Sequence, residues 1–173
     1  MNVGEQRAVI RTDWGRIELT ASETGVTSVV LKSGGRVGDW CRGTAASDTK
    51  KNGAFRTLEE AQAQLREYLA GARRDFSVPI DLSNGTAFQR SVWQAIRRIP
   101  YGRVRSYQWV AAKVGGKQYA RAVGMALGAN PIPIIVPCHR IVAHDGSLGG
   151  FGCGLPMKRR LLKLEGTLAQ LRV

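Results

Sequence analysis

A proline-rich apolar run in the second half of the chain constrains its fold more than any other segment. Residues 130–142 have the sequence NPIPIIVPCHRIV. Proline fixes φ and restricts the residue before it, so the first part, 130–133, cannot be helical. We expect 134–136 to form a short buried extended run that leads into Pro137 and Cys138. The run therefore predicts a buried, non-helical connection that ends in a cysteine.

The first third of the chain predicts a small β-sheet. Two β-prone runs, residues 7–12 and 16–20, flank the turn-forming sequence Asp13-Trp14-Gly15, and residues 26–31 suit a third strand. Residues 33–53 then lose all apolar periodicity and are rich in Gly, Ser, Thr and charge. This composition predicts a surface loop.

An amphipathic helix is expected after this loop. Thr57 would cap it, and Glu60 would complete a capping box. The segment 72–84 has the composition of a connector, so we expect two domains, residues 1–80 and residues 81–173. The first would be an α+β domain with a small sheet and one helix, and the second would be mostly helical.

The second half predicts a helix-turn-helix motif. Thr86 and Ser106 would each cap a helix, and a third helix is expected from about residue 117 to 128. Two short helices around the break at Gly115-Gly116 give a helix-turn-helix pattern, although any αα-hairpin gives the same pattern. A last helix would begin at Pro156.

The helix expected over residues 117–128 has few large side chains. Ala120, Ala122 and Gly124 are small, and Arg121 projects among them. Small residues allow the backbone to approach another surface closely. Tight packing between helices would explain some of these residues, whereas approach to a narrow groove is the more specific interpretation.

The charge balance predicts a polyanionic partner. Lys and Arg number 26 against 13 Asp and Glu, which gives a formal net charge of +13 and a pI near 10.5. This favours nucleic acid over membrane, although a basic surface that serves only solubility has the same composition. No apolar run approaches the roughly 20 residues of a membrane span, and the N-terminus has no apolar signal core. We therefore expect a cytoplasmic protein.

The cysteine and histidine counts argue against a disulfide framework and against a zinc site. The chain has three cysteines, with no C-x-x-C pair, and only two histidines. We therefore expect no metal and no cofactor.

Cys138 is the cysteine most suited to nucleophilic chemistry. A thiolate attacks an electrophilic carbon, and a nearby imidazole such as that of His139 favours the thiolate by lowering the thiol pKa. Adjacent side chains need not point together, and a free cysteine is about as often a small buried hydrophobe. Glu165 is the best acid to orient His139, although its spacing alone favours a solvated helix terminus.

These motifs resemble the active-site signature of the O6-alkylguanine-DNA alkyltransferases, also called methylated-DNA–protein-cysteine methyltransferases. Residues 130–142 carry the resemblance, which is specific from about residue 84 to 166. Further matching motifs are Ile99-Pro100-Tyr101-Gly102, Ser106-Tyr107, Ala120-Arg121-Ala122-Val123-Gly124, Gly149-Gly150-Phe151-Gly152 and Leu161-Leu162-Lys163-Leu164-Glu165-Gly166. The resemblance implies a ribonuclease H-like N-terminal domain and a winged-helix-like C-terminal domain.

The activity that this resemblance implies is direct-reversal DNA repair. In this family the cysteine takes an alkyl group irreversibly from O6 of guanine, or secondarily from O4 of thymine, and each molecule reacts once. Cys138 would be the nucleophile, His139 would remove the thiol proton through a water, and Glu165 would orient His139. Tyr107 would present its hydroxyl to the leaving base. Asn130 would tie the helix-turn-helix to the active-site turn.

The implied partner is double-stranded DNA that carries alkylated guanine, bound by a monomer. The helix-turn-helix would enter the minor groove, and the damaged base would be flipped out of the duplex. Arg121 would fill the gap that the base leaves. Other residues expected at the DNA are Ser106, Ala120, Ala122 and Gly124. The base pocket would be formed by Tyr107, Pro133, Ile141, Phe151 and Gly152.

The chain departs from the family pattern at the pocket. Many relatives carry tyrosine at the position of Phe151, and some carry serine at the position of Gly152. Cys153 stands where glycine is frequent, as a bystander or as an oxidation liability. Competing hypotheses are a damage-binding module without transfer, which the presence of Cys138 disfavours, a helix-turn-helix transcription factor, and a thiol hydrolase that uses Cys138 with His139.

Overall fold

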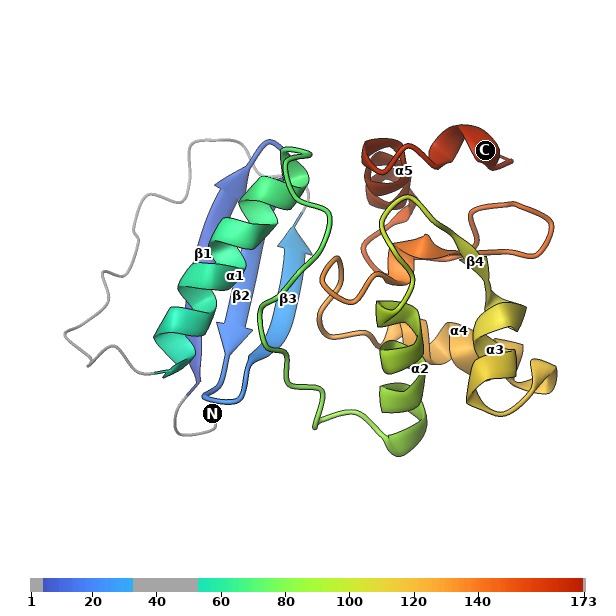
Figure 1. The fold of residues 1–173 in the computed structure, drawn as a ribbon, viewed down its shortest axis with the longest axis horizontal. Helices are drawn as coiled ribbons and strands as arrows, with labels where there is room; N and C mark the ends of the chain where they lie inside the picture. Colours follow the sequence, from blue (N-terminus) through green and yellow to red (C-terminus); the bar gives the residue numbers. More distant parts are fainter. Residues whose placement is uncertain (1–4, 33–52, 173) are drawn as a thin grey trace.

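Two domains lie side by side in the computed structural model of the chain (Figure 1). The structure describes residues 5–32 and 53–172. The N-terminal domain combines a three-stranded sheet with one long helix, and the C-terminal domain consists mainly of short helices. This architecture confirms the predicted α+β two-domain fold. Within the described ranges, no helix is long and apolar enough to cross a membrane.

The N-terminal sheet is an antiparallel meander with one buried face. Its strands, paired in sequence order, are β1 (Gln6–Thr12), β2 (Gly15–Ala21) and β3 (Val26–Lys32). Successive side chains of a strand point to opposite faces, so Ile17 and Leu19 are fully buried. All three strands lie where the sequence predicts them. The loop predicted over 33–53 lies, except for its last residue, outside the described residues.

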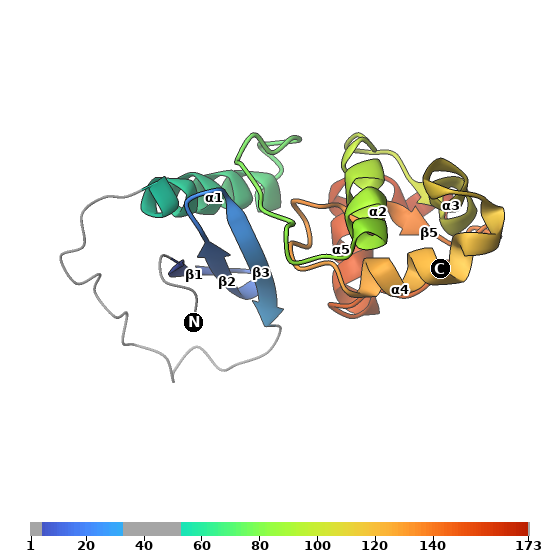
Figure 2. The same ribbon diagram turned by 90° about the horizontal axis from the view of Figure 1, so that it is seen from below.

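Helix α1 (Gly53–Leu69) covers the buried face of the sheet (Figure 2) and begins one turn earlier than predicted. Thr57 lies inside the helix and is buried, so the predicted cap at Thr57 with Glu60 is wrong. Ala54 and Leu58 extend the apolar face of the helix and are buried too. Their burial outweighs the local preference of threonine for the cap, which is worth only about 1 kcal/mol.

The C-terminal domain begins with two capped helices, as predicted. Helix α2 (Ala87–Arg97) is capped by Thr86, which forms a reciprocal capping box with Gln89. Helix α3 (Tyr107–Val114) is capped by Ser106, whose hydroxyl accepts a backbone amide of the first turn at 3.1 Å. Both caps satisfy amides that the helix itself leaves without a partner.

Helices α3 and α4 (Ala120–Gly128) form the predicted helix-turn-helix. Gly115 and Gly116 separate them with φ values of 148° and 142°, a backbone conformation that side chains disfavour. In Figure 2, α4 runs along the edge of the C-terminal domain. Helix α5 (Leu155–Leu164) closes the domain, with proline in its first turn as expected.

The proline-rich run folds as a tight buried turn and not as the predicted extended segment. Ile134 has a φ of 75°, and an isolated bridge joins Pro133 to Val136. The amide of Val136 donates to the carbonyl of Ile132 at 2.9 Å. A lone buried strand would leave such backbone groups unpaired, whereas the turn pairs them locally. A 3-10 turn at Cys138–Arg140 follows directly.

Polar contacts tie the N-terminal domain to the turn and to α5. The amide of Val29 in β3 donates to the carbonyl of Pro131 at 2.8 Å. The guanidinium of Arg160 lies 4.0 Å from the centre of the Trp14 ring and donates to the carbonyl of Asp13 at 2.9 Å. Because apolar residues of both domains also share one core, the sheet supports the segment that carries the cysteine.

Candidate active site

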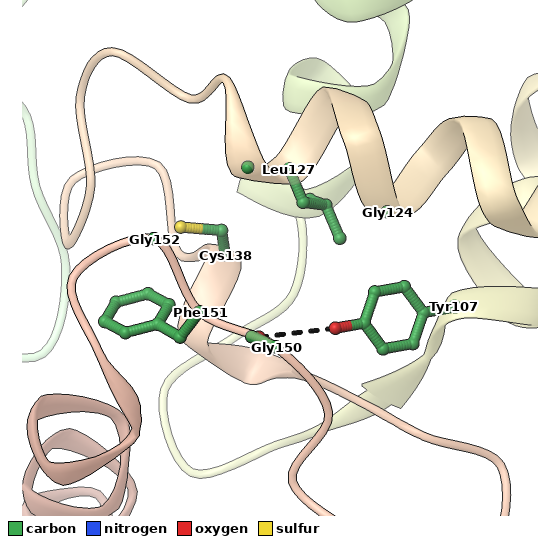
Figure 3. Close-up of a pocket in the computed structure, with 8 residues that line it drawn as sticks. Tyr107, Gly124, Leu127, Cys138, Gly150, Phe151 and Gly152 are labelled. Atoms are coloured by element: carbon green, nitrogen blue, oxygen red, sulfur yellow. Dashed lines mark hydrogen bonds between the residues drawn. The ribbon is translucent and has the colours of Figure 1, made fainter.

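A cavity of about 250 Å³ lies beside Cys138. Figure 3 shows that α4 forms one wall, through Gly124 and Leu127, and that the loop at 150–152 forms the opposite wall. Tyr107 of α3 closes a third side. Ligand pockets commonly occupy about 300–1,000 Å³, so this cavity suits one small group and not an extended chain.

The sulfur of Cys138 is buried and hydrogen-bonded. The residue is 6% exposed, and the side-chain amide of Asn130 donates to Sγ at 3.1 Å and to the carbonyl of Val136 at 2.9 Å. Burial raises the pKa of the Cys138 thiol to about 11, although the hydrogen bond from Asn130 favours the thiolate. The expected lowering of this pKa is therefore wrong for the resting site. The thiol is neutral, and a base must remove its proton.

His139 presents an unprotonated ring nitrogen within the same buried region. Its Nε2 lies 2.9 Å from Oε1 of Glu165. An ionised carboxylate only accepts hydrogen bonds, so Nε2 carries the ring proton. Nδ1 is buried and has no hydrogen-bond partner among the described residues. Burial lowers the pKa of His139 against the attraction of Glu165, so the imidazole is neutral at pH 7 and can accept a proton.

Glu165 lies in the core and not at a solvated helix end. The Nε and Nη2 groups of Arg140 donate to its carboxylate at 2.8–3.1 Å. The amide of Gly102 and the hydroxyl of Tyr68 donate to it as well. Burial would favour the neutral acid, but the hydrogen bonds from His139 and Arg140, together with the charge of Arg140, hold the pKa of Glu165 well below its usual range. Glu165 is therefore buried beside His139, and the solvated helix terminus that its spacing favours is wrong.

Lys158 is a fully buried cation that organises the loop of the cavity. Its Nζ donates to the carbonyls of Ile141 and Leu148 at 2.5 Å, and to that of Gly150 at 3.2 Å. One ammonium group therefore joins the short strand after the cysteine, β5 (Ile141–Val142), to the loop that walls the cavity. Burial lowers the pKa of Lys158 to about 8, so the group is still largely charged at pH 7.

Tyr107 lies across the cavity from the cysteine, with its hydroxyl directed to the loop (Figure 3). The hydroxyl donates to the carbonyl of Gly150 at 3.3 Å. Gly149 has a φ of 63°, and a Cβ there would lie 2.8 Å from the tyrosine oxygen. Only glycine at position 149 therefore allows the Tyr107 hydroxyl to lie this close to the loop. Burial raises the pKa of Tyr107, which keeps its hydroxyl protonated and able to donate.

The helix predicted to meet DNA has one free face. Arg121 and Met125 of α4 are exposed, whereas Leu127 on the other side is buried. Packing within the domain therefore accounts for the residues on one side of α4, whereas the residues on the other side are exposed. The small residues predicted at the DNA, each of them partly exposed, are Ala120, Ala122 and Gly124.

Other predicted site residues lie away from the cavity. Pro133 and Ile141 are buried and do not line it, and the hydroxyl of Ser106 is engaged as the cap of α3. Cys153 is partly buried and also absent from the lining, and Cys41 lies outside the described residues. In the part of the chain that the structure describes, no cluster of His, Cys, Asp and Glu could hold a metal ion.

Sequence reasoning missed three polar residues of the site, Tyr68, Arg140 and Lys158. The sequence contains a signal for Lys158, because this residue precedes Leu161 by three positions and Glu165 by seven. It therefore shares the inward face of an amphipathic helix. A charged residue at such a position predicts a buried, partnered charge.

Comparison with known families gives matches across both domains. The family model described as the ribonuclease-like domain of 6-O-methylguanine DNA methyltransferase matches residues 7–82. The model of the DNA binding domain of the same proteins matches residues 87–167.

Individual relatives match over most of their length. The methylated-DNA–protein-cysteine methyltransferase of Mycobacterium leprae is 51% identical over 66% of this chain and 67% of its own. The constitutive enzyme of that name from Bacillus subtilis is 40% identical over 89% of this chain and 91% of its own.

The fold is similar to that of a solved relative. The crystal structure of Mycobacterium tuberculosis OGT in complex with DNA matches with a TM-score of 0.75 and 38% sequence identity, covering 94% of this chain and 93% of that one. With both family models and relatives of near full length in agreement, the chain belongs to the 6-O-methylguanine DNA methyltransferase family.

Proposed function

We propose that this protein repairs alkylated DNA by moving an alkyl group from O6 of guanine to the sulfur of Cys138, once per molecule. The observation that carries the proposal is a buried thiol on the wall of a cavity sized for one base. Asn130 donates to the sulfur, and the neighbouring His139 has a ring nitrogen, Nδ1, that makes no hydrogen bond to any described residue. O4 of thymine, a similar alkylated oxygen, would be a secondary substrate.

The reaction would be an in-line displacement at the alkyl carbon. The bond from Sγ of Cys138 to carbon forms as the bond from carbon to O6 breaks, and the electron pair of the broken bond passes to guanine. The thiol proton passes through a water to Nδ1 of His139, and Glu165 stabilises the imidazolium. The leaving base gains a proton at its ring nitrogen, assisted by the hydroxyl of Tyr107. Because a thioether is not readily cleaved, the protein reacts only once.

The acid–base properties of the site would couple reactivity to substrate binding. With a thiol pKa of about 11 and a weakly basic imidazole, proton transfer from Cys138 to His139 is unfavourable at rest. Asn130 and Lys158 both stabilise the thiolate, through a hydrogen bond and a charge. The sulfur would thus become strongly nucleophilic only when an alkyl group lies in line with it.

The base would be held between α4 and the loop at 150–152. Phe151 and Gly152 line the cavity and would contact the base directly. Pro133 and Ile141 lie outside the lining, and we propose that they support the pocket wall from behind.

A basic surface would bind the DNA without regard to sequence. Residues 81–173 contain 14 Lys and Arg but three Asp and Glu, and so carry +11 of the net charge of +13. Phosphate contacts from such a surface suffice, since damage can occur at any guanine. Helix α4 would enter the minor groove with its small residues Ala120, Ala122 and Gly124, and Ser106 would lie at its border. Arg121 would replace the flipped base. The protein would act as a monomer on DNA in the cytoplasm.

Intact mass spectrometry tests the proposal directly. After incubation with duplex DNA containing O6-methylguanine, the protein is expected to gain one methyl group, which peptide mapping places on Cys138. Cys138→Ala should gain none and still bind DNA, whereas the matched variant Cys153→Ala should gain one. Methylation of Cys138→Ala, or none of the wild type, would disprove the assignment.

A further inference from the structure

Tyr68 carries a hydroxyl from the N-terminal domain into the active site. It lies in the last turn of α1, is fully buried, and donates to Oε1 of Glu165 at 2.5 Å. Its oxygen lies 3.3 Å from Nε2 of His139. Among the N-terminal residues that the structure describes, no other side chain is hydrogen-bonded to either of these two residues. The buried polar network therefore spans both domains.

The chemistry of the groups fixes the direction of each hydrogen bond. Because Glu165 only accepts, the hydroxyl proton of Tyr68 points to the carboxylate. The tyrosine oxygen then faces the Nε2–H group of His139 as a second acceptor. The other tautomer, with its proton on Nδ1, would lose both acceptors and would set a lone pair against the carboxylate. Tyr68 and Glu165 together select the tautomer whose Nδ1 is free.

The ring of Tyr68 is held independently of its hydroxyl. It packs edge-on against Tyr101, with ring centres 5.9 Å apart, and at a tilt against Phe76 at 5.1 Å. Burial, followed by the charge of Glu165, raises the pKa of Tyr68 far above its usual value, so the hydroxyl stays a neutral donor. Removing the oxygen alone should therefore leave the packing of the ring in place.

We propose that Tyr68 is a positioning residue for alkyl transfer, whose hydroxyl orients Glu165 and holds His139 as the tautomer able to take the thiol proton. The inference rests on the proposed function, in which His139 is the base. It makes the N-terminal domain a contributor to the chemistry and not only a support for the C-terminal domain.

Tyr68→Phe tests this role through the rate of alkyl transfer between pH 5 and 9. With free O6-benzylguanine and with methylated duplex alike, the rate at neutral pH should fall about tenfold, while DNA affinity stays unchanged. Without the hydroxyl, Glu165 loses the donor at 2.5 Å and attracts an imidazolium more strongly, and this outweighs the loss of the longer, 3.3 Å contact to Nε2, so the pKa of His139 rises. The acid limb of the pH–rate profile should therefore move to higher pH. The other charged groups that act on His139, namely Arg140 and Lys158, are the same in both proteins.

Tyr101→Phe is the matched control. Its hydroxyl donates to the backbone carbonyl of Leu164 at 2.8 Å and contacts neither His139 nor the carboxylate of Glu165. Its rate and pH profile should match those of the wild type. Identical rates and profiles for Tyr68→Phe and the wild type would overturn the proposal. A wild type that transfers no alkyl group would instead refute the proposed function.

Nitrogen NMR of the wild-type protein provides a second test that needs no variant. The chemical shifts of the imidazole nitrogens distinguish the two tautomers of His139. The proposal requires the proton on Nε2, and a proton on Nδ1 would overturn it even if Tyr68→Phe failed to fold.

Discussion

The side-chain amide of Asn130 lies 3.1 Å from the sulfur of Cys138 and donates a hydrogen bond to it. Hydrogen bonds to an ionised acceptor are roughly twice as strong as those to a neutral one. In the proposed reaction, the contact would therefore stabilise the attacking thiolate more than the resting thiol. Asn130 would then assist the reaction in addition to closing the turn through the carbonyl of Val136.

Asn130→Asp should slow alkyl transfer about 10- to 100-fold, because a hydrogen bond to a charged group is worth about 1.5–3 kcal/mol. The aspartate keeps an oxygen for the amide of Ile132 but brings a negative charge next to the sulfur. The measurement is the second-order rate with free O6-benzylguanine, which needs no DNA binding. Asn84→Asp, the same change at an exposed position, is the control and should react normally. An unchanged rate for Asn130→Asp would contradict this role.

Lys158→Met should loosen the loop of the cavity and lower both stability and activity. Each buried carbonyl left without a partner lowers the free energy of unfolding by about 1–3 kcal/mol. In a chain of this size, each kcal/mol lowers the melting temperature by about 2–4 °C. The three carbonyls together correspond to at least about 3 kcal/mol, so we expect the melting temperature to fall by at least about 6 °C and alkyl transfer to be largely lost. Lys163→Met, on the exposed side of the same helix, should change neither. Full activity of Lys158→Met would show that the loop does not depend on this cation.

The stability difference between the wild type and Glu165→Gln should depend on pH. The pKa of Glu165 is lowered in the folded chain. The stabilisation that ionised Glu165 contributes is therefore complete above its pKa in the unfolded chain, about 4.3. This stabilisation is lost as the pH falls through its pKa in the folded chain. Breaking a buried ion pair costs about 3–5 kcal/mol, so the gap in melting temperature should be large at pH 7 and should narrow toward pH 3.

Glu67→Gln is the matched control for this titration. Glu67 pairs with Arg73 at 2.6 Å on the surface and is half exposed. Such exposed pairs contribute about 0–1 kcal/mol to stability. The difference in melting temperature between the wild type and Glu67→Gln should therefore be small at every pH. A gap for Glu165→Gln that stayed constant from pH 7 to 3 would contradict an ionised, buried Glu165.

Arg121→Ala should separate the reaction on DNA from the reaction on a free base. Because Arg121 is exposed on α4 and does not line the cavity, the rate with O6-benzylguanine should be unchanged. With methylated duplex we expect a loss of about tenfold or more, since in the proposed role Arg121 fills the place of the flipped base, and alanine cannot. Arg11→Ala removes an exposed arginine of the N-terminal sheet and should affect neither reaction. Equal losses on both substrates would exclude the proposed role.

Features that depend on neighbouring residues could be predicted from the sequence. Thr86 and Ser106 act on amides within their own helices, so their caps are where the pattern places them. The turn at Asp13–Gly15 is equally local, since the two strands pair immediately around it. Thr57 fails as a cap because distant residues of the sheet bury the turn before it.

Features that depend on distant partners could not be predicted from the sequence. Glu165 is buried because Arg140 and Tyr68, 25 and 97 positions away, pair with it. The thiol pKa of Cys138 rises because the whole fold excludes water from the sulfur, and this outweighs the hydrogen bond from Asn130. The adjacency of His139 in the sequence predicts the opposite, a lowered thiol pKa.

The enclosed charges of the site have a consequence for ionic strength. Arg140, Glu165 and Lys158 are buried, and they contribute two positive charges and one negative charge. Moving a proton from the sulfur to the imidazole leaves this enclosed total unchanged, and mobile ions screen buried groups poorly. Added salt should therefore weaken the encounter between the basic domain and the phosphates while leaving the making and breaking of bonds untouched.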